Sequence, residues 1–308
     1  MTSLPLIIVN PTSAGGATRK AWPGIASELS THFGAFTCAF TARSGDAAKL
    51  AAKGALEGRI LIIACGGDGT INEVANGILE SGADASLGIL PSGTGGDFQR
   101  TLKIPTRVAD AARVLREGRM RRIDVGRASF VNHVGEVETR YFLGVASFGM
   151  SGEVIRRVKE RDAGWLSGKA SFALAMLQTT LALESTTALV QLDDHREKRL
   201  TVANLCIANA RYFGGGMKIA PEAKLDDGQF DIVSIGDLSA LRILTNAPQL
   251  YLGTHLGMEQ VHHAHARHVT ARPVQADEKV AIEIDGELPG YLPATFEIMP
   301  QALRVRCP

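Results

Sequence analysis

The chain has 308 residues, of which 45% are hydrophobic and 21% are charged. This length suits two domains better than one core, and the composition is that of a folded protein rather than a disordered one. The 33 basic and 32 acidic residues leave a formal net charge of +1. Such a balance gives no reason to expect a nucleic-acid partner or a strong attraction to an anionic membrane.

The N-terminus, MTSLPLIIVNP, has no basic segment, and its apolar run is only as long as a strand, so we do not expect a signal peptide. The longest uncharged stretch, 170–183, is too short to span a bilayer and favours a buried or half-buried helix. The four cysteines follow no Cys-x-x-Cys spacing, which indicates free thiols in a reducing compartment. These features predict a cytoplasmic protein.

The first half of the chain alternates predicted strands and helices. Leu6–Val9 is a predicted strand that ends at Asn10, and the residues TSAGG follow it as a loop. Phe36–Phe40 is a second predicted strand, and an alanine-rich helix is predicted over Asp46–Leu56. Thr41 lies at the carboxyl end of the second strand, where open parallel sheets bind their ligands, so it is a candidate nucleotide contact.

The stretch 59–79, RILIIACGGDGTINEVANGIL, combines a strand, a glycine turn and an amphipathic helix. The apolar run Ile60–Ala64 is typical of a strand that is covered on both faces. The glycines that follow allow several N–H groups to approach an anion where a helix begins. Thr70 is the predicted N-cap of that helix. The stretch therefore predicts a nucleotide-phosphate site.

Asp68 places a carboxylate inside this glycine turn, where it would repel a phosphate unless a cation lies between them. Mg²⁺ fits this position because it is usually held by one or two carboxylates together with substrate phosphates. The alternative is a plain strand-to-helix turn in which Asp68 caps backbone amides. A Walker loop is excluded because no Gly-Lys-Ser/Thr follows, and the spacing does not match the dinucleotide fingerprint.

A second glycine loop, PSGTGGD, follows the predicted strand Leu87–Leu90. Thr94 is a candidate phosphate contact, and Asp97 is a candidate contact to metal-bound water. The alternative for Asp97 is an N-cap of the helix that continues through Phe98. A further helix is predicted at Val108–Leu115, and the next strand is entered at 121–125.

From about Ala128 the pattern changes to strands and turns, which predicts a second, mainly antiparallel β domain. Its predicted strands are Glu138–Val145, Thr187–Leu192, Leu200–Ala208, Phe230–Ile235, Val280–Ile284 and Thr295–Met299. Its predicted helices are Gly152–Lys159, Lys169–Leu183 and Leu238–Leu252. Two turns are candidate ligand contacts: the glycines of 213–217 allow close backbone approach, and 226–228 offers carboxylates. The alternative for 213–217 is a tight connection between strands, and for 226–228 it is an Asp-Gly hairpin turn.

Four histidines, His262, His263, His265 and His268, form a tract that suggests a zinc site. The tract lacks His-Glu-x-x-His spacing and offers no further ligand, so a partly exposed strand or loop is the preferred interpretation. A Ser-His-Asp hydrolase is not expected either, because the chain has no Gly-x-Ser-x-Gly elbow.

Five motifs occur along nearly the whole chain: NPTSAGG (10–16), GGDGTINEVANG (66–77), LGILPSGTGGDFQR (87–100), IANARYFGGGMKIAPEAKLDDGQFDIV (207–233) and IDGEL (284–288). Together they resemble the diacylglycerol kinase catalytic-domain family, which also includes sphingoid-base kinases. The resemblance implies an N-terminal three-layer α/β nucleotide-binding domain over 1–127 and a C-terminal β-sandwich domain over 128–308. It leaves open whether the last residues return to the first domain.

The implied activity is the ATP- and Mg²⁺-dependent phosphorylation of a lipid hydroxyl, for example that of diacylglycerol. Alternatives are a sphingoid-base or other glycerolipid kinase, an NAD kinase-like enzyme with the same Gly-Gly-Asp-Gly-Thr loop, and a non-catalytic nucleotide- or lipid-binding protein. A lipid substrate implies transient contact with a membrane surface. The oligomeric state stays open, with a homodimer among the options.

The resemblance also implies roles for individual residues. The implied ATP contacts are Asn10, Thr12, Thr41, Gly66, Gly67, Asp68, Gly69, Thr70, Ile71, Asn72, Glu73 and Thr94. The implied Mg²⁺ ligands or water-mediated contacts are Asp68, Asp97 and Asp124. A second, structural Mg²⁺ is implied at Lys224, Asp227 and Gln229. For Asp124 the alternative is an ion pair with a neighbouring arginine, and for 226–228 it is a hairpin turn.

Asp285 is the implied general base, Glu287 supports metal-bound water or the nucleotide, and Asp68 takes part in catalysis. The alternative for Asp285 is a solvated Asp-Gly turn. Two positions depart from the family pattern. Ala14 replaces a glycine and Gly96 replaces an asparagine, so we expect altered loop geometry and reduced turnover.

Overall fold

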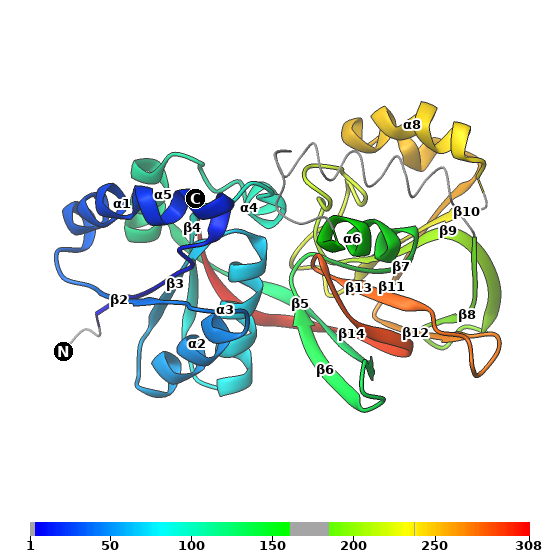
Figure 1. Ribbon diagram of the computed structural model, residues 1–308, viewed down its shortest axis with the longest axis horizontal. Helices are drawn as coiled ribbons and strands as arrows, with labels where there is room; N and C mark the ends of the chain where they lie inside the picture. Colours follow the sequence, from blue (N-terminus) through cyan, green and yellow to red (C-terminus); the bar gives the residue numbers. More distant parts are fainter. Residues whose placement is uncertain (1–3, 161–184, 237) are drawn as a thin grey trace. The chain divides into compact units, whose positions relative to one another are not determined.

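The computed structural model describes residues 4–160, 185–236 and 238–308, and it divides into two compact units. Unit 1 comprises Met1–Asp124 and Pro300–Pro308, and unit 2 comprises Val125–Met299. Two strands, β5 (Arg119–Asn132) and β14 (Glu287–Cys307), run through the boundary between the units (Figure 1). The boundary therefore lies three residues before the expected one, and the end of the chain belongs to unit 1.

Unit 1 is built on a parallel sheet in the order β2-β1-β3-β4-β14. The strands other than β14 are β1 (Leu6–Val9), β2 (Thr37–Phe40), β3 (Leu61–Gly66) and β4 (Ser86–Pro91). Ile62 and Ile63 have no exposed surface, so the apolar run that predicted a covered strand does form one. The sheet is thus the central layer of an α/β unit.

Helices cover both faces of this sheet, with α1 and α5 on one side and α2 and α3 on the other (Figure 1). They are α1 (Ala17–Phe33), α2 (Asp46–Leu56), α3 (Asp68–Ser81), α4 (Asp97–Leu102) and α5 (Val108–Glu117), with a short 3-10 turn η1 (Ser13–Gly16) before α1. The predicted N-cap at Thr70 is wrong. The helix already starts at Asp68, because the extended Gly67 lets the chain turn directly after β3.

Unit 2 is a set of mainly antiparallel strands. In addition to parts of β5 and β14, it contains β6 (Val137–Phe142), β7 (Val145–Gly149), β8 (Thr186–Leu192), β9 (Lys198–Ala208), β10 (Phe230–Gly236), β11 (Val261–Ala266), β12 (His268–Pro273) and β13 (Ala281–Ile284). Their pairing follows the path β11-β10-β9-β7-β13-β14, while β12 pairs with both β8 and β14. Every predicted strand of this region overlaps an observed one, as expected for a β-rich domain.

The main core of unit 2 combines aliphatic side chains with a group of phenylalanines. Phe142 stacks on Phe230 with ring centroids 5.6 Å apart and meets Phe296 edge-to-face. A smaller apolar cluster, which includes Val233 and Val261, packs on the other face of β10 and β11. Alternate residues of these strands therefore serve two different cores.

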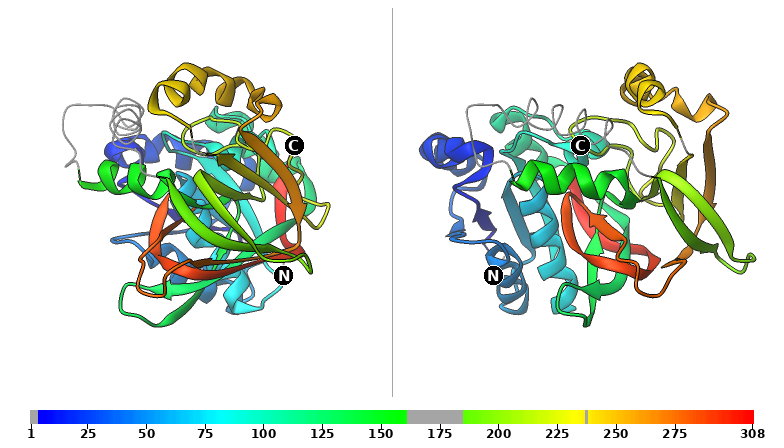
Figure 2. Two further views of the ribbon diagram at one scale, coloured as in Figure 1. Left: turned by 90° about the vertical axis from the view of Figure 1, so that its right-hand side faces the viewer. Right: turned by 45° about the vertical axis from the view of Figure 1, so that its right-hand side comes forward.

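Among the described residues, unit 2 has the helices α6 (Met150–Glu160) and α8 (Ala240–Leu252) and a 3-10 turn η2 (His255–Gly257). Figure 2 shows α8, in gold, on the outside of the unit. The predicted helix Lys169–Leu183 lies outside the described residues. Within those residues, no helix combines the length and the apolar character that crossing a membrane requires.

Candidate active site

The predicted nucleotide contacts of unit 1 follow the carboxyl ends of four parallel strands. Asn10 follows β1, Thr41 follows β2, the segment Gly67–Glu73 follows β3, and Thr94 follows β4. Because these strands are parallel, their carboxyl ends lie at one edge of the sheet. The sequence-predicted residues are thus gathered at one edge of the sheet, on the loops and in the first turns of α3.

Asn10 connects the first loop to the central glycine motif. Its amide Nδ2 donates to Thr70 Oγ1 at 3.0 Å, while its Oδ1 accepts from both the backbone N–H and the hydroxyl of Thr12, at 3.1 and 2.8 Å. The backbone N–H of Asn10 also donates to the carbonyl of Cys65, at 3.0 Å. The hydrogen bonds of Asn10 therefore hold the loop after β1 against the start of α3.

The two glycine loops touch through their backbones. A Cβ atom placed on Gly93 would lie only 2.5 Å from the Cα of Gly67, so this approach requires glycine. The Ser92 N–H donates to the carbonyl of Gly66 at 2.9 Å, and the Ser92 hydroxyl lies 2.6 Å from the Thr18 hydroxyl. The loops after β3 and β4 and the start of α1 thus form one connected structure.

The Asp68 carboxylate accepts hydrogen bonds from three consecutive backbone N–H groups of the second glycine loop. The donors are Gly96 at 2.7 Å, and Asp97 and Phe98 at 3.2 Å each. Asp68 therefore caps the start of α4, a helix more than 25 residues further along the chain. The structure thus shows Asp68 capping backbone amides, as in the alternative interpretation of this turn, but the amides belong to the loop after β4.

Three further acidic residues of unit 1 have partners of their own. Glu73 accepts from the Ala47 N–H at 3.1 Å and from the Ser44 hydroxyl at 3.3 Å, which fixes the start of α2. Asp97 pairs with Arg100 at 2.8 Å. Asp124 has no exposed surface and accepts from the backbone N–H of Gln301 at 2.7 Å, a contact that sequence reasoning did not anticipate.

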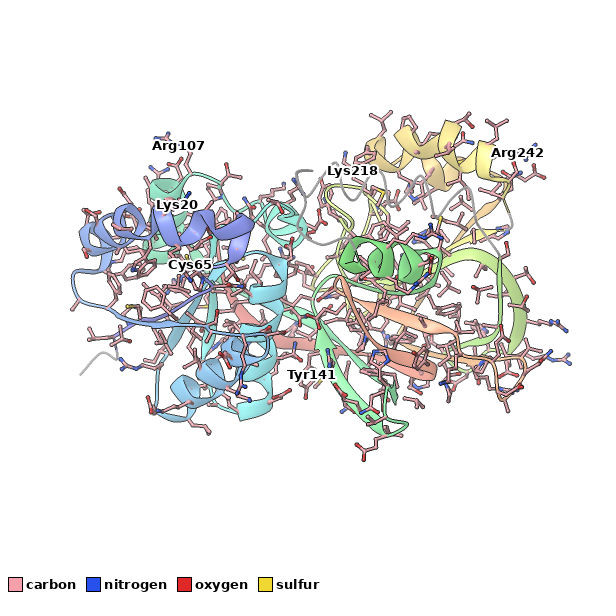
Figure 3. The ribbon with its side chains drawn as sticks, viewed as in Figure 1. Lys20, Cys65, Arg107, Tyr141, Lys218 and Arg242 are labelled. Carbon is pink, nitrogen blue, oxygen red and sulfur yellow. The ribbon has the colours of Figure 1, made fainter. Side chains whose placement is uncertain are left out.

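Cys65, labelled in Figure 3, lies at the end of β3 beneath these loops. Its burial raises the pKa of the thiol to about 12. A thiol with this pKa stays protonated at neutral pH and is no nucleophile. Cys65 therefore serves packing.

In unit 2, the Asp285 carboxylate also accepts from three consecutive backbone N–H groups. The donors are Leu143 at 2.8 Å, Gly144 at 2.9 Å and Val145 at 3.0 Å. Asp285 itself has a left-handed backbone, with φ of 46°, in the turn between β13 and β14. The alternative of a merely solvated Asp-Gly turn is wrong, because backbone amides hold the carboxylate in one orientation.

Other predicted residues of unit 2 lie nearer to solvent. Glu287 begins β14 and pairs with Arg140 at 3.1 Å. Lys224 and Asp227 are exposed, and Asp227 accepts from the N–H of Gln229 at 3.2 Å, as in a turn. The glycines of 213–217 form a tight turn in which the N–H and C=O of Phe213 and Met217 pair reciprocally.

Comparison with known proteins identifies both units. Residues 5–128 match the family model of the diacylglycerol kinase catalytic domain, and residues 144–307 match that of the YegS C-terminal NAD kinase beta sandwich-like domain. A diacylglycerol kinase of Staphylococcus saprophyticus is 31% identical over 98% of this chain and 94% of its own length. The chain belongs to the diacylglycerol kinase family. The Bacillus subtilis diacylglycerol kinase is also 31% identical, over 94% of this chain and 91% of its own length.

Solved structures confirm the fold of this family member. A chain from Bacillus anthracis has a TM-score of 0.78 and 24% identity, and the match covers 99% of this chain and 97% of that one. The predicted fold class, an α/β domain followed by a β-sandwich-like domain, is confirmed by these matches.

Sequence reasoning missed a buried acid of this diacylglycerol kinase family member. Glu283 on β13 is 4% exposed. It accepts from the Ser147 hydroxyl and, at 2.6 Å, from the N–H of Gly286 in the turn that carries Asp285. The sequence signal that could have indicated this buried acid is the single charged residue inside the apolar run 280–284. Glu283 and the amides of 143–145 support the same turn from two sides.

Proposed function

We propose that this chain transfers the γ-phosphoryl group of ATP to a hydroxyl of a lipid such as diacylglycerol. Family membership makes the chain a lipid kinase, and a kinase of this family uses ATP as its phosphate donor. The observation that carries the proposal is the group of mutually bonded glycine loops at the carboxyl edge of the unit 1 sheet. Phosphoryl transfer requires mainly positioning and charge stabilisation, which such loops supply.

Unit 1 is proposed to bind the nucleotide. Gly66, Gly67 and Gly69 place backbone N–H groups at the start of α3, where the helix dipole favours an anion. Thr41 and the exposed Thr94, which follow β2 and β4, supply further side chains to the proposed contact set. Asn10 and Asp68 hold the nucleotide-binding loops in position through hydrogen bonds, and they are also proposed to contact the nucleotide.

The donor set of the signature carboxylates fits Mg²⁺, which takes oxygen ligands. Asp68 and Asp97 are the proposed holders of the ion, with Asp124 as a further proposed contact, and the bound ion would neutralise charge that develops on the transferred group. A second, structural Mg²⁺ is proposed at Asp227 with the neighbouring residues Lys224 and Gln229. The exposed position of that turn is compatible with a hydrated ion.

Asp285 is proposed as the group that accepts the proton of the lipid hydroxyl, with Glu287 nearby in the sequence to hold water. The three N–H donors hold the Asp285 carboxylate in one orientation. A carboxylate in its charged form can accept the proton of an attacking hydroxyl. A general base contributes about 10²–10⁴-fold to the rate.

The test is Mg²⁺-dependent transfer of label from γ-labelled ATP to diacylglycerol, a sphingoid base or NAD, each supplied separately. We expect labelled phosphatidic acid that depends on Mg²⁺. A preference for the sphingoid base or NAD would replace the proposed acceptor, and ATP binding without turnover on any acceptor would favour the non-catalytic alternative.

In the same assay, Asp285→Asn should lower turnover by about 100-fold or more with little change in the KM for ATP. A matched control is Glu197→Gln, which removes a surface charge of unit 2 that pairs with Arg272. Hydrogen exchange of Gly144 and Val145, which donate to the one oxygen that asparagine can retain, separates loss of the base from loss of structure. Unchanged exchange with lost turnover supports the base, whereas near-normal turnover of the folded variant contradicts it.

Contact with a membrane surface is proposed to occur through unit 2, while the protein resides in the cytoplasm. On α8, the side chains of Leu241 and Leu252 are 71% and 68% exposed, and Tyr251 is also exposed. Apolar side chains on an outer helix favour shallow contact with lipid. Flotation with vesicles should therefore weaken in Leu241→Ser/Leu252→Ser, and equal flotation of variant and parent would contradict this role.

A further inference from the structure

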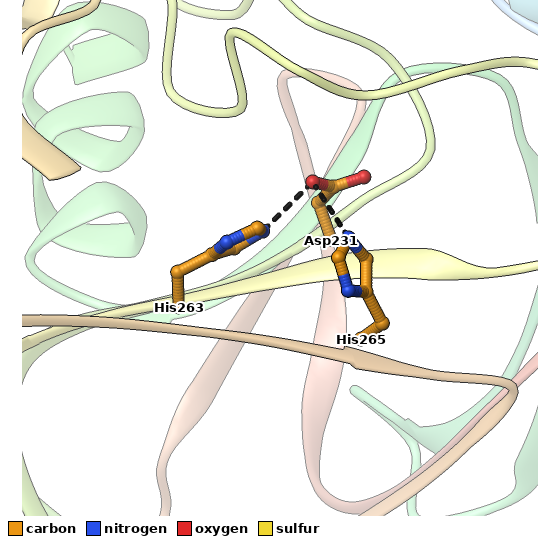
Figure 4. Close-up of side chains that lie close together, drawn as sticks. All are labelled: Asp231, His263 and His265. Atoms are coloured by element: carbon orange, nitrogen blue, oxygen red, sulfur yellow. Dashed lines mark hydrogen bonds and ion pairs between the residues drawn. The ribbon is translucent and has the colours of Figure 1, made fainter.

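Two imidazole rings in unit 2 approach the same carboxylate oxygen. Asp231 Oδ1 lies 2.8 Å from His263 Nε2 and 3.6 Å from His265 Nε2. One ligand atom from each of the three residues lies within 4.8 Å of the other two (Figure 4). The two rings lie edge-to-face, with centroids 4.8 Å apart.

The strand register explains this meeting. Strands β10 and β11 are antiparallel, and Asp231 lies directly opposite His265. His263 is two residues from His265 on β11, so its side chain leaves the same face of the sheet. His262 is offset by one residue and leaves the other face. The register therefore selects two of the four histidines.

Burial and charge favour a cation at this cluster. The Asp231 side chain is only 4% exposed, and that of His263 is 21% exposed. A buried carboxylate needs a compensating positive partner. The side chain of His265 is 49% exposed, which leaves a path from solvent to the buried oxygen.

We propose that Asp231, His263 and His265 bind a divalent transition-metal ion of the zinc class. Two imidazole nitrogens and one carboxylate oxygen are a donor set that zinc uses in proteins, and a water would complete a tetrahedron. Ligand atoms around tetrahedral zinc lie about 3.3 Å apart, given metal–ligand distances of about 2.0–2.1 Å. The 2.8 and 3.6 Å separations from the carboxylate oxygen lie on either side of that value. All three ligand atoms lie within 4.8 Å of one another, so side-chain rotation would bring them to the distances that zinc requires.

The bound ion would join β10 to β11, the strand at the end of the sheet order, and so stabilise unit 2. The histidine tract suggested zinc in the sequence, but it contains no third ligand, so a strand or loop was the preferred interpretation. Asp231 supplies the third ligand from 32 residues upstream of His263, through strand pairing. This site is distinct from the residues assigned to phosphoryl transfer and does not depend on that reaction.

The test uses the full chain without a polyhistidine tag, stripped of metal, in zinc titrations against a chromophoric chelator. We expect one zinc ion per chain. His265→Ala should weaken binding at least about tenfold, since even residues that only support metal ligands change affinity by 10–100-fold. The matched control is His262→Ala, which removes a histidine of the same strand from the other face and should leave the affinity unchanged.

A second measurement covers the case in which a variant binds zinc elsewhere. Zinc should raise the melting temperature of the parent and of His262→Ala, but not that of Asp231→Asn or His265→Ala. Absence of stoichiometric binding in the parent overturns the proposal. Equal weakening by His262→Ala and His265→Ala also overturns it, because the tract would then bind metal without a defined site.

Discussion

Gly93→Ala should separate the two glycine loops of unit 1. The added methyl would lie 2.5 Å from the Cα of Gly67 and 3.1 Å from its nitrogen. Carbon atoms in contact prefer about 3.5–4.0 Å, so the loops must move apart by about 1 Å. Both neighbours are backbone atoms, so no side-chain rotation relieves the clash. Overpacking of this kind costs about 1–3 kcal/mol.

The functional effect should exceed the effect on stability. A displacement of about 1 Å in a positioning element can cost about 100-fold in rate, and we expect a loss of this size in kcat/KM for ATP. The melting temperature should fall by only about 2–4 °C per kcal/mol of destabilisation. Steady-state kinetics with varied ATP and a thermal melt measure the two effects separately.

The control for this variant is Gly24→Ala. Gly24 lies in α1 with no atom within 4 Å of a built Cβ, so the substitution adds a methyl without a clash. It should leave kinetics unchanged and keep or slightly raise stability, because alanine favours helix over glycine. Parent-like kinetics in a folded Gly93→Ala protein would refute the idea that the loops must touch for nucleotide use.

The remaining predictions concern the same unit. Asp68→Ala should abolish transfer and speed the hydrogen exchange of the amides of 96–98, while the overall fold survives; parent-like turnover would contradict its role. Gly96→Asn should fold, because asparagine tolerates its left-handed φ of 71°, and should lower the KM for ATP, although the Gln99 carboxamide must shift. An unchanged or poorer kcat/KM would show that the loop has adapted to glycine. In native protein, iodoacetamide should modify Cys38 far ahead of the buried Cys65, as peptide mass spectrometry would show.

Local patterns predicted most elements of the fold. The strand Leu6–Val9 and the helix Asp46–Leu56 have the predicted bounds, because apolar runs and helix-start residues act over a few positions. Strand β14 was predicted only at 295–299, although it extends over Glu287–Cys307. Its prolines and Gly290 interrupt any local strand pattern, and pairing with several partners maintains it.

The candidate site was predictable as a set of loops, but its internal contacts were not. Parallel strands place their carboxyl ends together, so Asn10 and Thr41 could be assigned to one edge from sequence. The bonds from Asp68 to 96–98 and from Asp124 to Gln301 join residues far apart in the chain. No periodicity encodes such pairs. Ala14 illustrates the reverse case, since its left-handed φ of 53° explains why glycine is usual there.

The two aspartates that are proposed to take part in phosphoryl transfer are held in the same way. Asp68 holds the amides of 96–98, and Asp285 holds those of 143–145. Three successive N–H groups on one carboxylate form an anion-binding concavity, here filled by the protein's own side chain. Removing either carboxylate leaves three donors unpaired, which costs stability besides any chemistry. Loss of turnover in Asp68→Ala therefore includes this structural effect. Asp285→Asn keeps one acceptor oxygen, so its loss of turnover indicates a catalytic role when the exchange of Gly144 and Val145 stays as in the parent.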